Sequence, residues 1–577
     1  MHEFSVWAPY ARNVDVQADG WLYEMTPGEG GWWCRELDDP GPGTRYGFRL
    51  DRGPIRPDPR SRSQPDGVDG LSEVIDPTAF EWTDDEWRGI SARGLVLYEL
   101  HVGTFTPEGT FDAAIEKLDH LVDLGVTAVE VMPVVEFPGS RGWGYDGVDL
   151  FAPHHSYGGP QGLCRFVNAC HERGLGAVLD VVYNHLGPSG NYLREFGPYF
   201  SERHQTSWGA AVNFDGPGSD EVRRFVIDNA EAWLRDYHFD GLRLDAVHAI
   251  ADDSARHILE ELAAEVDSLA TYLRRPLFLI AESDLNDPRL VRSPDAGGYG
   301  LDSAWADEWH HALHAVLTGE RVGYYADFGS LDLLGKALRQ AWVHDGTWSP
   351  FRQRHYGRSP EGLAGHRFVT FTQNHDQVGN RATGERLAAL VGEGRLKIAA
   401  ALLLSSPFTP MLFQGEEWAA GTPFQYFTDH DDPKLAKSVS DGRRNEFVQF
   451  GWKPEQVPDP QSYDTFQRSK LDWHELREPP HAGVLDWYRR LIALRRRYPE
   501  LSDPRPGSIA VEFSEEEATI RLRRGRIVVL VNLSSDGRKF DVAQHRRMLA
   551  SSFDPANGDP ETIVLPPDSV ALLLDER

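Results

Sequence analysis

Cysteine is scarce in this 577-residue sequence, which contains only Cys34, Cys164 and Cys170. Three cysteines cannot supply a disulfide framework, and their spacing matches no metal-binding pattern. So sparse a number is typical of proteins kept in a reducing compartment. No uninterrupted apolar run approaches the roughly 18 residues of a membrane-spanning helix. The start, "MHEFSVWAPYARNV", has neither the basic nor the apolar part of a signal peptide. We therefore expect a soluble, cytoplasmic protein.

Positive charge is also in deficit, since 59 basic residues stand against 89 acidic ones and the formal net charge is −30. Such a surface repels nucleic acid and anionic membranes, so we expect neither as a partner. A neutral substrate such as a sugar is indifferent to this charge. The 17 tryptophans fit a sugar well, because flat rings pack against the apolar C–H faces of sugar rings.

The pattern of the sequence changes twice along the chain. Residues 1–88 hold short alternating stretches such as "EFSVWAP" and "TRYGFRL" between turn-rich segments, which indicates a small β-sandwich. Residues 500–577 alternate again, as in "TIRLRRGRIVVLVNLSS", which indicates an antiparallel β domain. Residues 89–499 instead alternate apolar strands with amphipathic helices. We therefore expect three domains with these boundaries.

Eight apolar stretches of the middle segment are predicted strands: "LVLYELHVG", "VTAVEVMPV", "GAVLDVVYNH", "DGLRLDAV", "LFLIAESD", "SAWADEW", "RFVTFTQNHD" and "FTPMLFQGEE". Helical or irregular segments separate them. In "FDAAIEKLDHLVDLG", for example, Phe111, Ile115, Leu118 and Val122 recur at helical spacing. Strands that are apolar on both faces are typical of parallel sheets, and eight of them predict a closed (β/α)8 TIM barrel of the α/β class.

Four of these strands run into polar clusters at their C-terminal ends. The clusters contain Asn184 and His185; Arg243, Asp245 and His248; Glu282 and Asp284; and Asn374, His375, Asp376, Asn380 and Arg381. A lone aspartate at a strand end is more often a helix cap or an ion-pair partner than a catalyst. Barrel active sites, however, are assembled from these strand ends. The four clusters together therefore predict one pocket.

Three carboxylates in one pocket suit the hydrolysis or transfer of glycosidic bonds. One carboxylate attacks the anomeric carbon while a protonated second one donates to the departing oxygen, which gives a covalent intermediate and net retention. A third can hold ring hydroxyls as the sugar distorts. An arginine beside the nucleophile keeps it ionised, whereas the acid needs a raised pKa.

At this point the clusters resemble the four short regions of the α-amylase family of glycoside hydrolases. "DVVYNH" is similar to the first region, "GLRLDAVH" to the second, "AESD" to the third and "NHDQVGN" to the fourth. The resemblance implies that Asp245 is the nucleophile, Glu282 the general acid/base and Asp376 the transition-state stabiliser.

The same resemblance implies a set of substrate-binding residues. Arg243 would neighbour the nucleophile, and His185 and His375 would bind the sugar at the cleavage point, above Tyr145 of "GWGYDGVDLFAP". The remaining predicted contacts are His248, Asp307, Glu308, His310, His311, Gln377 and Asn380. Two adjacent histidines are by themselves more often structural than functional. Trp143 and Trp208 are candidates for stacking on sugars, with burial in the core as the alternative.

Three longer stretches narrow the choice within the family. "WGYDGVDLFAPHHSYGGP", "IAESDLNDPRL" and "DSAWADEWHHALHAVLTGERVGYYADFG" resemble its trehalose-releasing members, and this resemblance covers essentially the whole chain. Such enzymes hydrolyse the α-1,4 bond next to the terminal trehalose of maltooligosyl trehalose, which a partner, maltooligosyl trehalose synthase, produces. A 1,4-α-glucan branching enzyme is the alternative, because it passes the same intermediate to a sugar hydroxyl. A glycan-binding protein without activity is disfavoured, because all three acids are present.

No catalytic metal and no other cofactor is expected. The acidic run "DHDDP", Asp429 to Pro433, lacks the alternating oxygen ligands and the glycine of an EF-hand. A solvated loop is the simpler interpretation. The trehalose-releasing enzymes that the sequence resembles are not expected to need calcium.

Overall fold

A closed barrel of parallel strands forms the centre of the molecule. The computed structural model describes residues 2–446, 452–542, 544–555 and 561–576. The strand order around the barrel is β9–β10–β13–β16–β17–β18–β21–β22 and back to β9, which confirms the predicted TIM barrel. The bounds of the strands are β9 (Leu97–Leu100), β10 (Ala128–Val131), β13 (Gly176–Val181), β16 (Gly241–Leu244), β17 (Phe278–Ala281), β18 (Ser303–Trp305), β21 (Phe368–Phe371) and β22 (Thr409–Phe413).

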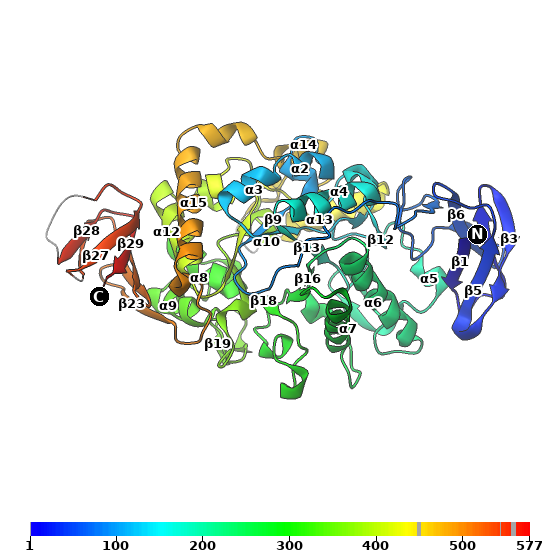
Figure 1. Ribbon diagram of the computed structural model, residues 1–577, viewed down its shortest axis with the longest axis horizontal. Helices are drawn as coiled ribbons and strands as arrows, with labels where there is room; N and C mark the ends of the chain where they lie inside the picture. The colour runs from blue at the N-terminus through cyan, green and yellow to red at the C-terminus, as the bar shows by residue number, and fades with distance from the viewer. Residues whose placement is uncertain (1, 447–451, 543, 556–560, 577) are drawn as a thin grey trace.

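Helices surround the barrel, as the predicted strand–helix alternation requires (Figure 1). The longer ones are α4 (Gly159–Glu172), α6 (Ser219–Arg235), α7 (Ile258–Leu273), α8 (Asp307–Thr318), α9 (Leu331–Gln340), α12 (Glu393–Ser405), α13 (Pro433–Glu446) and α15 (His481–Arg497). The apolar face of α4 packs on β13 and that of α8 packs on β21, whereas α13 lines the cavity at the strand ends. The connection between β17 and β18 has only short 3-10 turns, Pro288–Leu290 and Pro294–Ala296.

The segment 111–125 differs from its predicted single helix. It forms two short helices, α2 (Phe111–Ile115) and α3 (Leu118–Leu124), with a turn at Glu116 and Lys117. The break rotates the second helix, so that Leu118, Leu121 and Leu124 are its buried residues. Val122, which helical spacing placed on the buried face, is 40% exposed.

Antiparallel sheets occupy the two ends of the molecule (Figure 1). The N-terminal part pairs β1 (His2–Trp7), β5 (Trp32–Leu37) and β4 (Thr26–Pro27) in one sheet, and β3 (Trp21–Glu24), β2 (Val14–Ala18), β6 (Arg45–Leu50) and β7 (Ile55–Arg56) in another, with β8 (Ser72–Glu73) also on β6. The C-terminal sheet has the order β23 (Ile509–Ser514), β24 (Thr519–Arg524), β25 (Ile527–Asn532), β29 (Ser569–Asp575) and β27 (Arg546–Ser551). A separate pair joins β26 (Arg538–Asp541) and β28 (Thr562–Leu565).

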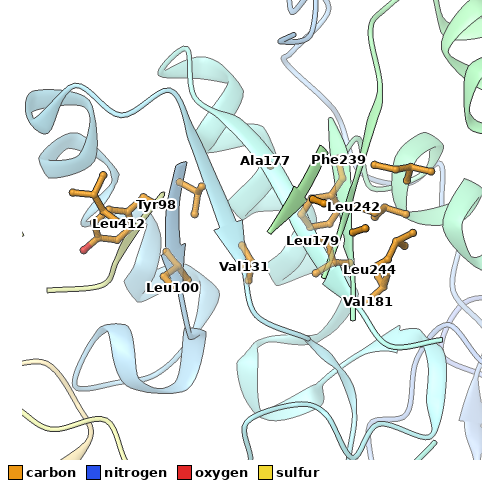
Figure 2. Close-up of a cluster of buried hydrophobic side chains, with 14 of the residues drawn as sticks. Tyr98, Leu100, Val131, Ala177, Leu179, Val181, Phe239, Leu242, Leu244 and Leu412 are labelled. Carbon is orange, nitrogen blue, oxygen red and sulfur yellow. The ribbon is translucent and has the colours of Figure 1, made fainter. Parts of the chain in front are cut away.

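Alternation along the barrel strands separates two kinds of side chain. Successive strand residues point to opposite faces. Tyr98, Leu100, Val131, Leu179, Val181, Leu242 and Leu244 belong to the core between strands and helices, and Figure 2 shows them. Leu97, Ala128, Val178, Phe278, Ile280, Trp305, Val369 and Met411 form a separate cluster inside the barrel. The alternation therefore turns the polar residues Glu99, Glu130, Asp180 and Arg243 into the barrel, next to that cluster and toward its C-terminal end.

None of the helices among the described residues is both long enough and apolar enough to cross a membrane.

Candidate active site

The C-terminal ends of the barrel strands open into a cavity of about 490 Å³ that contains the three predicted acids. Asp245 directly follows β16, Glu282 directly follows β17, and Asp376 lies in α10 (His375–Gly379) after β21. The lining residues are Trp143, Tyr145, Asp146, His185, Trp208, Asp245, Ala246, His248, Glu282, His375, Asp376, Asn380, Tyr426, Val439, Arg443 and Glu446. Segments far apart in the sequence thus meet in one place.

Asp245 is held by two donors on neighbouring strands. Arg243 Nη1 donates to its Oδ1 at 2.7 Å, and Asn184 Nδ2 donates to its Oδ2 at 2.8 Å. Arg243 is fully buried, with its guanidinium carbon 4.2 Å from the ring centroid of Trp305. A buried cation at this distance favours the ionised carboxylate. Asp245 is therefore fixed in position beside a buried cation, as a nucleophile needs to be.

Glu282 has the opposite electrostatics. Its Oε2 accepts a hydrogen bond from the amide of Ala246 at 2.6 Å, whereas Arg243 Nη2 is 3.8 Å away. Burial raises the pKa of Glu282 to about 7, and the negative charges of Asp245 and Asp376 act in the same direction against the pull of Arg243. This carboxyl group can therefore hold a proton near neutral pH, as a general acid must.

Asp376 is the most accessible of the three acids, with 40% of its side chain exposed. Asn374 accepts hydrogen bonds from the amides of Asp376 and Gln377 and so begins α10. Asn380 Nδ2 donates to Asp376 Oδ1 at 3.3 Å, and His375 Nε2 is 3.5 Å from the same oxygen. An accessible carboxylate beside two hydrogen-bonding side chains can receive sugar hydroxyls.

Aromatic side chains form the walls of the cavity. Tyr145 stacks on His375 with ring centroids 5.2 Å apart. Trp208 lies between the strands β14 (Phe200–Thr206) and β15 (Gly209–Val212), is 53% exposed and stacks on His185 at 5.4 Å. Trp143 is buried and donates through its indole nitrogen to the carbonyl of Gln425. Of the two tryptophan candidates, Trp208 presents the freer face to a sugar.

Eight of the predicted site residues line the cavity, and Arg243 lies directly beneath them. Asp307 is not among the lining residues. It lies near Glu282 and Asp376, because the charges of these two acids, together with burial, raise its pKa well above the usual range. Gln377 is buried beside the amide cap of α10. Neither residue is among those that line the cavity.

Glu308, His310 and His311 lie outside the cavity. Glu308 is 1% exposed, and its carboxylate accepts the amides of Val343 and His344 at 2.8 and 2.7 Å and His344 Nδ1 at 2.6 Å. His310 bonds to the carbonyl of Thr372 and to the hydroxyl of Tyr325. His311 is buried and stacks on Tyr324 at 4.8 Å. Glu308 and His310 thus bond to other groups of the chain, and their contact with substrate stays a prediction.

Two residues outside the predicted set, Asp180 and Arg443, complete the site. Asp180 accepts from Arg243 at 2.9 and 3.0 Å and from the hydroxyl of Tyr145 at 2.7 Å. Arg443 of α13 donates to Asn380 Oδ1 at 2.9 Å and lines the cavity. Asp180 could have been predicted, because it lies near the polar C-terminal end of β13. Arg443 could not, because it lies in α13, outside the four polar clusters at the strand ends.

Two groups of side chains in the described part of the chain have the spacing of metal ligands. They are Glu136, His154 and His155, and His204, Asp215 and Asp253. In each group a histidine already bonds to a carboxylate, His155 to Glu136 at 2.7 Å and His204 to Asp215 at 3.1 Å. Asp429 of the acidic run pairs with Arg141 at 2.7 Å. Neither group lies among the residues that line the cavity.

Comparison with known proteins identifies relatives across the whole chain. Residues 57–208 match the model of the alpha amylase catalytic domain. A malto-oligosyltrehalose trehalohydrolase from Arthrobacter ramosus is 56% identical over 536 residues, 92% of each chain, and one from Rhizobium sp. (strain M-11) is 50% identical over 99% of this chain and 97% of its own. The chain belongs to the malto-oligosyltrehalose trehalohydrolase family. It is thereby a glycoside hydrolase of the alpha-amylase family.

Less similar relatives are consistent with membership of this family. A crystal structure from Salmonella typhimurium described as an alpha amylase superposes with a TM-score of 0.91 at 39% identity, over 99% of this chain and 97% of that one. A 1,4-alpha-glucan branching enzyme from Xanthomonas oryzae pv. oryzae is 27% identical over 92% of this chain and 71% of its own. The trehalohydrolases are thus far more similar to this chain than that branching enzyme is.

Proposed function

We propose that the protein hydrolyses the α-1,4-glucosidic bond next to the terminal trehalose of maltooligosyl trehalose, releasing trehalose and a maltooligosaccharide. Its membership of the trehalohydrolase family supports the substrate. The observation that carries the chemistry is that one cavity holds an arginine-bound Asp245 beside a Glu282 whose pKa is raised to about 7. A pair of carboxyl groups with opposed protonation preferences is what acid–nucleophile catalysis at a glycosidic bond requires.

The reaction proceeds by double displacement with net retention. Asp245 Oδ attacks the anomeric carbon of the glucose unit in the cavity while Glu282 gives its proton to the oxygen of the departing trehalose. Glu282, now ionised, then takes a proton from water, which attacks the same carbon and releases the maltooligosaccharide from Asp245. Asp376 holds the hydroxyls of the distorted ring during both steps.

The neighbours of the acids keep this geometry in place. Arg243 and Asn184 direct the carboxylate of Asp245, so that little reorganisation is needed before attack. Tyr145 and His375 form a flat, polar surface beneath the bound ring. His185 and Trp208 stack at another part of the cavity wall and offer a sugar both a hydrogen bond and an apolar face.

We also propose where the enzyme is located and which enzyme supplies its substrate. A cytoplasmic location is supported by three cysteines that are all free. The substrate must come from an enzyme that converts the reducing end of a maltooligosaccharide to trehalose, and we propose a maltooligosyl trehalose synthase as this functional partner. The two enzymes together would carry out trehalose biosynthesis.

A product assay on two matched substrates tests the proposal. Purified protein is incubated separately with maltotriosyl trehalose and with maltopentaose, and free trehalose is quantified. We expect rapid release of trehalose from the first and slow or no cleavage of the second. Absence of trehalose, with new α-1,6 branches formed on a longer α-glucan, would assign the branching reaction instead.

A further inference from the structure

A buried glutamate on the first barrel strand is bonded to the histidine that precedes Asp376. Glu99 of β9 is 1% exposed, and its Oε1 lies 2.6 Å from His375 Nδ1. Its Oε2 accepts the backbone amide of His375 at 3.0 Å. Both carboxylate oxygens are thus used by one residue, which lies 276 positions away in the sequence. The pair fixes both the ring and the backbone at the start of α10.

The hydrogen bonds on the other side of His375 indicate where its protons lie. Arg243 Nη1 donates to both oxygens of Asp180, and this cation favours the ionised carboxylate against the burial that raises the pKa of Asp180 to about 7. The single hydroxyl proton of Tyr145 goes to Asp180 Oδ2 at 2.7 Å, so the same hydroxyl oxygen must accept from His375 Nε2 at 2.8 Å. A proton on Nε2 together with a carboxylate facing Nδ1 makes the ring an imidazolium.

We propose that Glu99 is a positioning residue that keeps His375 doubly protonated, so that Nε2–H always points as a donor toward Tyr145 and the sugar. Continuous hydrogen bonds then connect Glu99, His375, Tyr145, Asp180, Arg243 and Asp245 in that order. With a neutral imidazole the proton would stay on Nδ1, facing Glu99, and Nε2 would become an acceptor. The hydroxyl of Tyr145 would then donate to His375 in place of Asp180. Asp180 would lose this hydrogen bond, and the chain of bonds that leads to Asp245 would be broken there.

Charged and titratable groups on several neighbouring elements surround His375. They are Glu99 on β9, His101 after β9, Glu130 on β10, Asp180 on β13, Arg243 on β16, Tyr145, and Asp376 on the same helix. Burial and Arg243 lower the pKa of His375, but Asp376 and Glu99 raise it by more, so that its pKa is raised to about 9. The geometry and the charges therefore agree.

Glu130 provides a matched control for Glu99. The two residues are register partners on adjacent strands, and each is 1% exposed. Neither carboxyl oxygen of Glu130 has a hydrogen-bond partner among the described residues, and burial followed by the charge of Glu99 raises its pKa well above the usual range. Glu130→Gln thus changes a neighbouring buried side chain that does not bond to His375, whereas Glu99→Gln removes the carboxylate that does.

The first test uses nuclear magnetic resonance of the intact protein labelled with ¹⁵N-histidine, with the His375 signals assigned by comparison with His375→Gln. At pH 7.5 we expect both ring nitrogens of His375 to be protonated in the parent protein, in Glu130→Gln and in Glu99→Asp, which keeps the charge. In Glu99→Gln the titration of His375 should move down by about 1–3 pH units, the usual effect of losing an adjacent opposite charge.

A neutral His375 in the parent protein at pH 7.5 would overturn the proposal, and this result needs no variant to fold. A titration that Glu99→Gln leaves unchanged would overturn it as well. These measurements follow the ring of His375 itself. They therefore decide the role of Glu99 even if the proposed trehalose-releasing function, on which the role of the sugar rests, proves wrong.

The second test measures kcat/KM for fluoride release from α-maltotriosyl fluoride, whose leaving group departs without the proton of Glu282. For the parent protein and Glu130→Gln we expect the alkaline limb to follow His375, near pH 9. For Glu99→Gln it should move down by the same 1–3 units. Equal limbs in Glu99→Gln and Glu130→Gln would contradict a role of Glu99 through His375.

Discussion

At the scale of single residues, one buried arginine distinguishes two neighbouring acids. Arg243 is 2.7 Å from Asp245 but 3.8 Å from Glu282, so the cation bonds directly to the first acid and not to the second. Burial raises the pKa of Glu282 to about 7 against the opposing effect of Arg243. A carboxyl group that can hold its proton near neutral pH thus lies beside the arginine-bound Asp245.

The pH profile of hydrolysis should follow from this difference. Glu282 carries its catalytic proton below its pKa and loses it above, so kcat/KM for maltotriosyl trehalose should fall as the pH rises through about 7. Steady-state rates measured from pH 4 to 9 check this, and a rate that is level between pH 6 and 8 would contradict the assignment of Glu282.

Replacement of the nucleophile should abolish activity without unfolding the protein. In Asp245→Asn we expect kcat to fall by about a thousandfold or more, because no covalent intermediate can form. Arg243 keeps its bonds to Asp180, so the melting temperature should change little. Asp112→Asn, which alters an exposed ion pair with Arg165, is the control with normal turnover. Near-normal kcat in Asp245→Asn would reject the mechanism.

Some residues of the site could be predicted from the sequence and others could not. The three acids and His375 were recognisable because each follows an apolar strand. The contact between Glu99 and His375 joins residues 276 positions apart, and it exists only because β9 and β22 close the barrel. Glu308 carried a family motif, yet its bonds to Val343 and His344 depend on a loop whose path the motif does not encode.

At the scale of elements, backbone geometry at Gly144 places Tyr145 in the cavity. Gly144 has φ +102°, and a Cβ atom there would lie 2.2 Å from the carbonyl oxygen of Pro133. Alanine is strained in this conformation and would also collide with the strand-end backbone. The loop that carries Tyr145 therefore requires glycine at this position.

A pair of glycine substitutions separates these two effects. Gly174 has φ +73°, and a Cβ atom there would meet no other atom of the described residues within 4 Å, so Gly174→Ala should cost only about 1 kcal/mol of stability and leave kcat/KM unchanged. Gly144→Ala should lose more stability and, because Tyr145 is displaced, at least about tenfold in kcat/KM. Denaturation curves and steady-state kinetics on both variants check this. Equal kinetics would show that Gly144 does not position the site.

The barrel strands could be predicted from the sequence more completely than the segments that connect them. All eight predicted barrel strands are present, because buried parallel strands have a strong apolar signal. The segment 111–125 was predicted as one helix, and the turn at Glu116 and Lys117 has no proline or glycine to announce it. Packing of Leu121 and Leu124 against the barrel, rather than local propensity, determines where the second helix points.

At the scale of the whole molecule, the N-terminal sheets dock on the barrel through charge and one buried ring. Arg60 and Arg62 pair with Asp228 and Asp236 of the barrel segment, at 2.8 and 2.7 Å. Trp7 packs edge-on against Tyr199 with ring centroids 5.4 Å apart. The sequence predicted the module, but these contacts across more than 160 positions could not be inferred from it.

The docking can be tested with two tryptophans of the same module. Trp7 is 5% exposed and Trp21 is 72% exposed. Trp7→Ala should cost about 3–5 kcal/mol of stability because it empties the contact with the barrel, whereas Trp21→Ala should stay within about 0.5 kcal/mol of the parent. Urea denaturation measures both. Similar values for the two variants would show that the module does not brace the barrel.

Trehalose release and the retaining mechanism can be tested together by following the hydrolysis of maltotriosyl trehalose by ¹H nuclear magnetic resonance from the first seconds. We expect free trehalose together with maltotriose that appears first as its α-anomer and only later equilibrates with the β-anomer. Maltotriose appearing first as the β-anomer would contradict double displacement through Asp245. Products without trehalose would contradict the proposed function.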